Sequence, residues 1–290
     1  MGYKYREVQG NNQEQLIIIA KTNLRKRKLA MKFIITIDDA EAETLKLLLM
    51  ENVDIPIVIG VPVGLIGREW ENKIIATIDL IKTAIKGLDV EIASHGYYHI
   101  VPGDSKVNYF LKFIRGLSSH PDKSDYIFRL FNFAKRARVM THVYVPEVEI
   151  IQSQKYLENL CNLPIITFLY PGGYVTKELL DIVQEKYLFA RTTNIGINLL
   201  SNLRKTPDKF LLKTISVSRY TNFSKLEKYY LKLKKMGNQT EEIIVIETYH
   251  ILTHHKPKTL YEIPFKIFNS HYRFLKSSGT ICRFIDLQKL

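Results

Sequence analysis

The chain has 290 residues, of which 46% are hydrophobic, enough for one large α/β domain or two small ones. No apolar run approaches the roughly 20 residues that span a bilayer, and the N-terminus lacks the apolar core of a signal peptide. We therefore expect a cytoplasmic or membrane-peripheral protein. Its two cysteines form neither a disulfide framework nor a CxxC metal motif.

The net charge of +13 is unevenly distributed. Residues 1–32 contain eight Lys or Arg against two acidic residues, and residues 204–235 contain ten against two. Such segments are either ordinary solvated surface or basic patches that meet an anionic partner. As that partner we expect an anionic glycan or a membrane surface, and we do not expect nucleic acid.

Residues 1–30 are polar and basic and predict an N-terminal extension, whereas residues 31–290 predict the main folded domain. Strands are predicted at residues 33–37, 56–62, 89–93, 164–169, 188–192, 213–217, 243–248 and 280–285. Helices are predicted at residues 41–51, 70–86, 147–161, 176–187, 224–235 and 261–277. Helical segments are also predicted in the polar stretch at about 105–140. Apolar strands separated by helices indicate a parallel sheet covered on both faces, and seven or eight such units favour a barrel.

Polar clusters follow several of the predicted strands. Asp38 and Asp39 follow the first strand, and His95 follows the third. Pro171 and His250 follow two later ones. In α/β barrels the C-terminal ends of the strands are where active sites are assembled from successive loops. We therefore expect these clusters to meet at one end of the barrel.

The histidine and aspartate pairs each allow two interpretations. His95 and His99 are four residues apart, so they are either two ligands of a zinc-like metal or partly buried hydrogen-bonding residues. Asp38 and Asp39 cannot both point inward along a regular strand, because side chains alternate. At a turn, one can bind a metal while the other faces a bound water. Alternatively, they cap the helix that begins near Glu41.

Two further segments offer groups for catalysis. The Tyr-Pro-Gly-Gly sequence at 170–173 is either a plain turn or a loop whose backbone N–H groups stabilise an oxyanion. His250 directly follows an apolar strand whose last residues are polar, and its side chain can act as an acid.

In this order and spacing, the segments resemble the polysaccharide deacetylases of carbohydrate esterase family four, which share the chitooligosaccharide-deacetylase homology domain. The resemblance covers about residues 31–290. It rests on the motifs Thr36-Ile37-Asp38-Asp39, His95-Gly96-Tyr97-Tyr98-His99, Tyr170-Pro171-Gly172-Gly173 and Thr248-Tyr249-His250.

The resemblance implies a distorted (β/α) barrel, often of seven parallel strands, and removal of N-acetyl groups from an amino-sugar polysaccharide or glycoconjugate. It implies one divalent metal, usually zinc and otherwise cobalt or nickel. The metal ligands would be Asp39, His95 and His99. Asp38 would be the general base, the N–H of Gly172 would stabilise the oxyanion, and His250 would be the general acid.

The chain departs from the family pattern at several positions. Ala40 replaces a glycine, and Leu169 stands where many members have an arginine that orients the catalytic aspartate. Thr248 replaces a leucine that lines the acetyl pocket, and no Asp-x-x-Asp-Trp motif supplies a partner for His250. Two alternatives therefore stay open. One is an amide C–N hydrolase acting on a small non-sugar molecule, and the other is a catalytically silent protein that binds through its basic patches.

Overall fold

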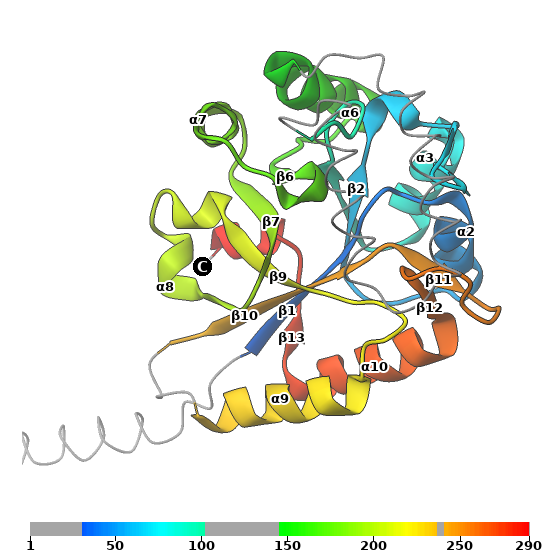
Figure 1. The fold of residues 1–290 in the computed structure, drawn as a ribbon, viewed down its shortest axis with the longest axis vertical. Coiled ribbons are helices and arrows are strands. Elements are labelled where there is room, and N and C mark those ends of the chain that lie inside the picture. Colours follow the sequence, from blue (N-terminus) through cyan, green and yellow to red (C-terminus); the bar gives the residue numbers. More distant parts are fainter. Residues whose placement is uncertain (1–30, 102–144, 237–240, 290) are drawn as a thin grey trace, which may run out of the picture.

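The computed structural model describes residues 31–101, 145–236 and 241–289. The predicted N-terminal extension and the predicted helical stretch at about 105–140 lie outside the described residues. The described segments are built around a closed barrel of parallel strands (Figure 1). Its strands are β1 (Met31–Ile37), β2 (Ile57–Val61), β5 (Val90–Ser94), β6 (Thr167–Leu169), β7 (Phe189–Ile195), β9 (Leu212–Ser216) and β10 (Ile243–Tyr249).

These seven strands pair in the order in which they occur in the chain, and β10 closes the ring by pairing with β1 along its whole length. The predicted barrel of seven parallel strands is confirmed. Helices surround it (Figure 1). They are α2 (Ala42–Met50), α3 (Ile78–Gly87), α6 (Ser153–Cys161), α7 (Lys177–Lys186), α8 (Leu200–Leu203), α9 (Phe223–Met236) and α10 (Phe265–Ser278).

Short strands extend this framework. The strand β13 (Thr280–Ile281) adds to β1 in parallel, and β8 (Asn198–Leu199) adds to β10 in the antiparallel sense. Beyond the C-terminal end of β10, the strand β11 (Ile251–Thr253) pairs in parallel with β12 (Glu262–Pro264). The chain closes with a 3-10 helix at Ile285–Lys289.

Alternation along the strands separates two cores. One side-chain set fills the barrel interior and includes Ile34, Val58, Ala93, Leu169, Phe189, Ile244 and Ile246. The other set lies between the barrel and its helices and includes Phe33, Ile35, Ile57, Ile59 and Val245. Since both faces of β1, β2 and β10 are buried, these strands are mostly apolar, as expected from the sequence, whereas β7 and β9 also carry polar and exposed residues.

The C-terminal segment closes the base of the barrel. Phe284 stacks on Phe189 inside the barrel, with 6.0 Å between the ring centroids. The buried carboxylate of Glu91 accepts hydrogen bonds from the Ile285 N–H at 2.9 Å and the Thr167 hydroxyl at 2.6 Å. With the base closed, the opposite end of the barrel is left to form a site.

The helix predicted at 70–86 begins only at Ile78, so the first part of that prediction is wrong. Residues 69–74 instead form a hairpin of β3 (Glu69–Trp70) and β4 (Lys73–Ile74). Glu71 and Asn72 connect the strands with φ values of 50° and 64°. Two left-handed residues in a two-residue loop match the twist of a tight hairpin, and this local geometry overrides the helical periodicity.

Two other predicted boundaries also differ. The helix predicted at 261–277 begins at Phe265, because the preceding residues pair with β11 as strand β12. Only Thr280 and Ile281 of the strand predicted at 280–285 pair with β1. The remaining residues of that predicted strand, 282–285, pass beneath the barrel and close its base.

The outer faces of α9 and α10, which pack against each other, are strongly basic. Their exposed cations are Lys225, Lys228, Lys232, Lys235, Lys266, Arg273 and Lys276. Glu227 is the single acidic residue in the two helical sequences, and it bonds to His271 at 2.9 Å.

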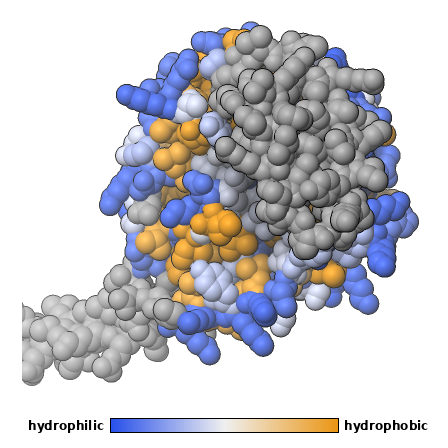
Figure 2. All heavy atoms as spheres, viewed as in Figure 1, coloured by the Kyte–Doolittle hydropathy of each residue, from blue (hydrophilic) through white to orange (hydrophobic). Residues whose placement is uncertain are grey.

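The face drawn in Figure 2 mixes hydrophobic and hydrophilic side chains, with hydrophilic ones around its margin. No helix in the described part of the chain is long and apolar enough to cross a membrane.

Candidate metal centre

The candidate site is the top layer of the barrel interior. Along β1, the inward positions run from the apolar Ile34 to Thr36 and then to Asp38. The Thr36 hydroxyl lies 3.0 Å from that of Thr248, which lies 2.8 Å from that of Thr214. A layer of linked hydroxyls therefore separates the apolar core from the charged mouth. Thr248 is part of this layer.

A left-handed bend brings both aspartates into the mouth. β1 ends one residue before Asp38, and Asp39 and Ala40 follow with φ values of 71° and 48°. Aspartate visits this region more readily than most residues do. The helix that follows is capped by Glu41, whose carboxylate accepts the Thr44 N–H at 2.6 Å. The two aspartates are thus not helix caps, which removes the alternative interpretation of this pair.

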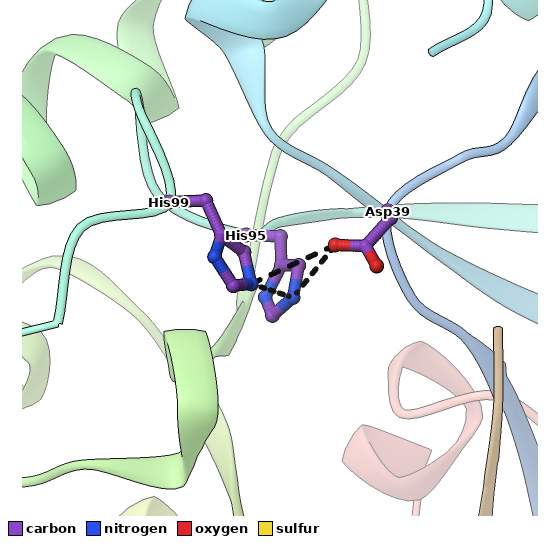
Figure 3. Close-up of side chains that lie close together, drawn as sticks. All are labelled: Asp39, His95 and His99. Carbon is purple, nitrogen blue, oxygen red and sulfur yellow. Dashed lines mark hydrogen bonds and ion pairs between the residues drawn. The ribbon is translucent and has the colours of Figure 1, made fainter. Parts of the chain in front are cut away.

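Asp39, His95 and His99 point toward one another (Figure 3). The Oδ1 atom of Asp39 lies 3.5 Å from the Nε2 of His95 and 3.6 Å from the Nε2 of His99. The two Nε2 atoms are 3.1 Å apart. The three side chains come from the ends of β1 and β5 and from the loop after β5, as the sequence analysis expected.

The donor set and its spacing fit a divalent cation. The Nδ1 of His95 lies 2.8 Å from the Leu169 carbonyl. A carbonyl only accepts, so Nδ1 carries the hydrogen and Nε2 keeps its lone pair. The buried Oδ1 of Asp39 has no hydrogen-bond partner among the described residues. Metal–ligand bonds of about 2.0–2.1 Å place tetrahedral ligands about 3.3–3.4 Å apart, close to the distances between these atoms.

Two residues of the unpredicted hairpin support this cluster. The ammonium of Lys73 forms an ion pair with the Oδ2 of Asp39 and lies 4.7 Å from the Trp70 ring centroid. The Trp70 ring packs against His99 with 4.6 Å between centroids. Burial raises the pKa of Asp39, but the Lys73 charge and then the histidines outweigh it, so the pKa lies below its usual value. The Asp39 carboxylate is therefore ionised at neutral pH.

Asp38 is held by a buried arginine that the sequence analysis did not identify. The Nη2 of Arg191 lies 2.6 Å from both carboxylate oxygens of Asp38, and the arginine side chain is fully buried. Arg191 lies on β7 directly beside Leu169 on β6, its register partner. The arginine that the resemblance places at the Leu169 position is therefore supplied from the neighbouring strand.

The guanidinium keeps Asp38 ionised. Burial raises the pKa of Asp38, but Arg191, followed by His95 and His250, outweighs burial and holds the pKa below its usual value. The same attraction makes the carboxylate a weaker base than an isolated one of ordinary pKa. For proton transfer, the advantage is that the Asp38 carboxylate is already deprotonated and that Arg191 holds it in one orientation.

His250 also lies at the mouth, directly after β10. Its ring packs on Tyr261 with 4.6 Å between centroids, and its buried Nδ1 has no hydrogen-bond partner among the described residues. Burial lowers the pKa of His250, although the charges of Asp38 and Asp39 oppose it. The ring is therefore neutral at pH 7 and has to gain a proton before it can donate one.

Gly172 lies in the tight 3-10 turn that follows β6. Its φ of 59° lies in the left-handed region, and a Cβ there would come 3.1 Å from a methyl of Val101. A side chain at this position would thus strain the backbone and crowd the neighbouring loop. The turn interpretation of this motif is borne out. Whether the Gly172 N–H acts on a substrate remains a prediction.

The sequence offered different signals for the residues that were missed. Arg191 is a charged residue in the middle of an apolar strand, an anomaly that could have marked it as functional. The Glu-Asn pair between Trp70 and Lys73 is a weak hairpin signal inside a helical pattern. Glu149 contacts the His99 loop across about fifty residues of chain, and no local pattern indicates that contact.

A scan against models of protein families finds no match, and a search of curated proteins finds none. Solved structures do match. The PuuE allantoinase aligns over 91% of both chains with a TM-score of 0.52 and 12% identity. A polysaccharide deacetylase from Bacillus cereus has a TM-score of 0.46 and 16% identity over 67% of this chain, and the match spans only half of its own length. A pseudoenzyme of carbohydrate esterase family four from Bacillus anthracis has a TM-score of 0.45 and 11% identity, over 90% of this chain and 66% of its own.

The similarity to the allantoinase, with its TM-score of 0.52, supports the barrel fold. The similar structures include polysaccharide deacetylases, the family that the sequence motifs resemble. One barrel fold can host several chemistries, so the reaction has to be argued from the residues at the mouth.

Proposed function

We propose that this protein is a metal-dependent hydrolase that removes N-acetyl groups from an amino-sugar polysaccharide or glycoconjugate. The observation that carries the proposal is the convergence of three ligand atoms beside an arginine-bound carboxylate at the barrel mouth. A carboxylate and two imidazoles leave a fourth position open, which is typical of catalytic rather than structural metal sites.

Asp39, His95 and His99 would hold one divalent ion, with zinc, cobalt or nickel as candidates. When bound, the ion supplies Lewis-acid chemistry, which polarises an amide carbonyl and makes water more acidic. Lys73 and the Leu169 carbonyl fix the two outer atoms of the ligand set, the Oδ2 of Asp39 and the Nδ1 of His95. Such outer contacts orient the ligands before any ion arrives.

Asp38 would act as general base. It takes a proton from the attacking water, whose oxygen bonds to the acetamide carbonyl carbon. The Gly172 N–H would donate a hydrogen bond to the resulting oxyanion. His250, once protonated, would give its proton to the nitrogen as the C–N bond breaks. The products are acetate and a free amine.

The direct test is acetate release from N-acetylglucosamine oligomers by the metal-loaded protein. We expect acetate and new amino groups in equal amounts, since one C–N bond yields one of each. Fully deacetylated oligomers of the same length serve as the matched control and should release nothing. The proposed substrate would be contradicted if neither the zinc-loaded nor the cobalt-loaded protein released acetate from any oligomer.

Arg191→Leu should lower kcat by about 100-fold or more, because general-base catalysis depends on a fixed, ionised carboxylate. Arg191→Lys keeps the charge on a shorter, more flexible side chain and should recover only part of the rate. The register of β6 and β7 permits a sharper control, the double variant Leu169→Arg/Arg191→Leu. If the arginine acts by holding Asp38, moving it one strand across should restore activity relative to Arg191→Leu. Full activity of Arg191→Leu would refute its role.

A small non-sugar amide is the alternative substrate. The same fold occurs in an allantoinase, so the barrel itself does not select a sugar. Rates on monomeric and oligomeric N-acetylglucosamine separate the two possibilities. A glycan enzyme should show kcat/KM rising with oligomer length, whereas a small-molecule hydrolase should show no such rise.

The second alternative is a binding protein without catalysis, and the basic faces of α9 and α10 favour it. Seven exposed cations could together give a salt dependence with a slope of about −6 in log K against log salt on duplex DNA. We expect random-sequence DNA to bind only at low salt. Affinity that persists at physiological salt in a protein without hydrolase activity would favour this alternative.

A further inference from the structure

A buried carboxylate holds the loop that carries His99. Glu149 lies in a π-helical turn at Glu147–Gln152, just before α6, and is 2% exposed. Its Oε2 accepts the Tyr97 N–H at 2.9 Å, and its Oε1 accepts the Tyr98 N–H at 3.0 Å. The neighbouring N–H groups of His99 and Ile100 also help to stabilise its charged form. Two consecutive amides are thus bound by one side chain.

This arrangement is the kind of backbone concavity that binds anions. The loop enters it through Gly96 with a φ of 77°, and His99 itself has a φ of 57°. A left-handed histidine is uncommon, and it persists where surrounding contacts fix the backbone. Here those contacts come from Glu149, and the resulting bend directs the His99 ring toward Asp39. A Cβ at Gly96 would come 2.6 Å from the Glu149 Oε2, so the loop and the carboxylate fit closely.

The turn that carries Glu149 is itself fixed to the barrel. The Ser153 hydroxyl lies 2.8 Å from the hydroxyl of Ser94, the last residue of β5. His95 follows Ser94 directly. Both histidines are therefore connected to the same turn. His95 is connected through the Ser94–Ser153 contact at the end of β5, and His99 through the loop that Glu149 binds.

We propose that Glu149 is a positioning residue for the metal centre: by binding the amides of Tyr97 and Tyr98, it holds the following His99 in ligating geometry before a metal arrives. This inference rests on the proposed metal site. Glu149 touches neither ligand atoms nor substrate, so it acts through the loop. Its loss should loosen one ligand and leave Asp39 and His95 in place.

The test is zinc affinity, measured by competition with a chromophoric chelator for wild type, Glu149→Gln and Glu147→Gln. Glutamine has nearly the same shape but turns an NH₂ group toward backbone donors. We expect Glu149→Gln to bind zinc about 10- to 100-fold more weakly, the usual cost of removing an outer partner of a metal ligand. Glu147→Gln makes the same side-chain change two residues away at an exposed position and should bind as wild type does.

The absorption spectrum of the cobalt-loaded variants gives a second readout. The proposal expects an altered d–d spectrum for Glu149→Gln, because one ligand is misplaced, and an unchanged one for Glu147→Gln. Wild-type affinity and spectrum in Glu149→Gln would overturn it.

If Glu149→Gln does not fold, hydrogen exchange in the metal-free wild-type protein still decides. The amides of Tyr97 and Tyr98 should exchange much more slowly than in an unstructured peptide. Exchange at the free-peptide rate would overturn the proposal. The two hypotheses fail separately: a wild type that binds no zinc refutes the metal site, whereas protected amides in that same protein would leave the hold of Glu149 on the loop intact.

Discussion

Asp39→Ala is expected to abolish stoichiometric zinc binding and hydrolysis together. The substitution removes the one anionic ligand of the cluster and leaves two neutral imidazoles. Loss of an outer partner alone costs about 10- to 100-fold in metal affinity, so loss of a ligand should exceed that range. Metal content after gel filtration and chelator competition measure the effect.

Two controls separate metal loss from loss of folding. Alanine at φ 71° strains the backbone and leaves the Lys73 ammonium without its partner carboxylate, so Asp39→Ala should also be less stable. Asp39→Asn keeps the shape and the tolerance for a left-handed backbone but removes the charge. It should fold with a melting temperature closer to wild type and still bind zinc poorly. Asp79→Ala, at an exposed helical position, controls for generic loss of an aspartate. Wild-type zinc affinity in both Asp39 variants would mean that the cluster is not a metal site.

Asp38→Asn is expected to keep the metal and lose turnover. Asp38 lies beside the cluster, its Oδ2 3.8 Å from the Nε2 of His95, and its carboxylate is occupied by Arg191. Removing a general base typically costs about 10²- to 10⁴-fold in rate. We therefore expect kcat to fall by that factor while the dissociation constant for zinc stays within a few-fold of wild type.

The contrast between the two neighbouring aspartates is itself informative. If Asp38→Asn stays fully active, the base has been assigned to the wrong residue. If it loses zinc as Asp39→Ala does, both carboxylates are ligands. Since an amide leaves the Arg191 charge buried without an anion, a melting curve of Asp38→Asn is needed to exclude unfolding as the cause of lost activity.

The barrel could be predicted because most of its strands are buried on both faces. These strands appear in the sequence as short, largely apolar runs between helices, and the order of runs gives the order of strands around the barrel. Residues 69–74 could not be placed in the same way. Their hairpin depends on two left-handed residues at Glu71 and Asn72, whereas the apolar spacing continues into α3 and favours a helix.

The cluster of Asp39, His95 and His99 could be predicted in part, because Asp39 and His95 follow strand ends, where topology fixes their neighbours. The parallel order of β1, β2 and β5 brings these two together, whereas the placement of His99 depends on the loop after β5. Arg191 and Glu149 could not be placed, because their roles depend on which side chain reaches across between strands or loops. Leu169 illustrates the difference: its sequence position suggested a missing arginine, and only the β6–β7 register shows that the neighbouring strand supplies one.

The most direct test of the metal-dependent hydrolase is the metal content of the purified protein, with acetate release measured on the same sample after zinc or cobalt loading. The proposal predicts one bound ion per chain and acetate released from N-acetylglucosamine oligomers. One ion without acetate would point to a different amide substrate. No bound ion after loading would contradict the proposal, because Asp39, His95 and His99 would then be structural residues.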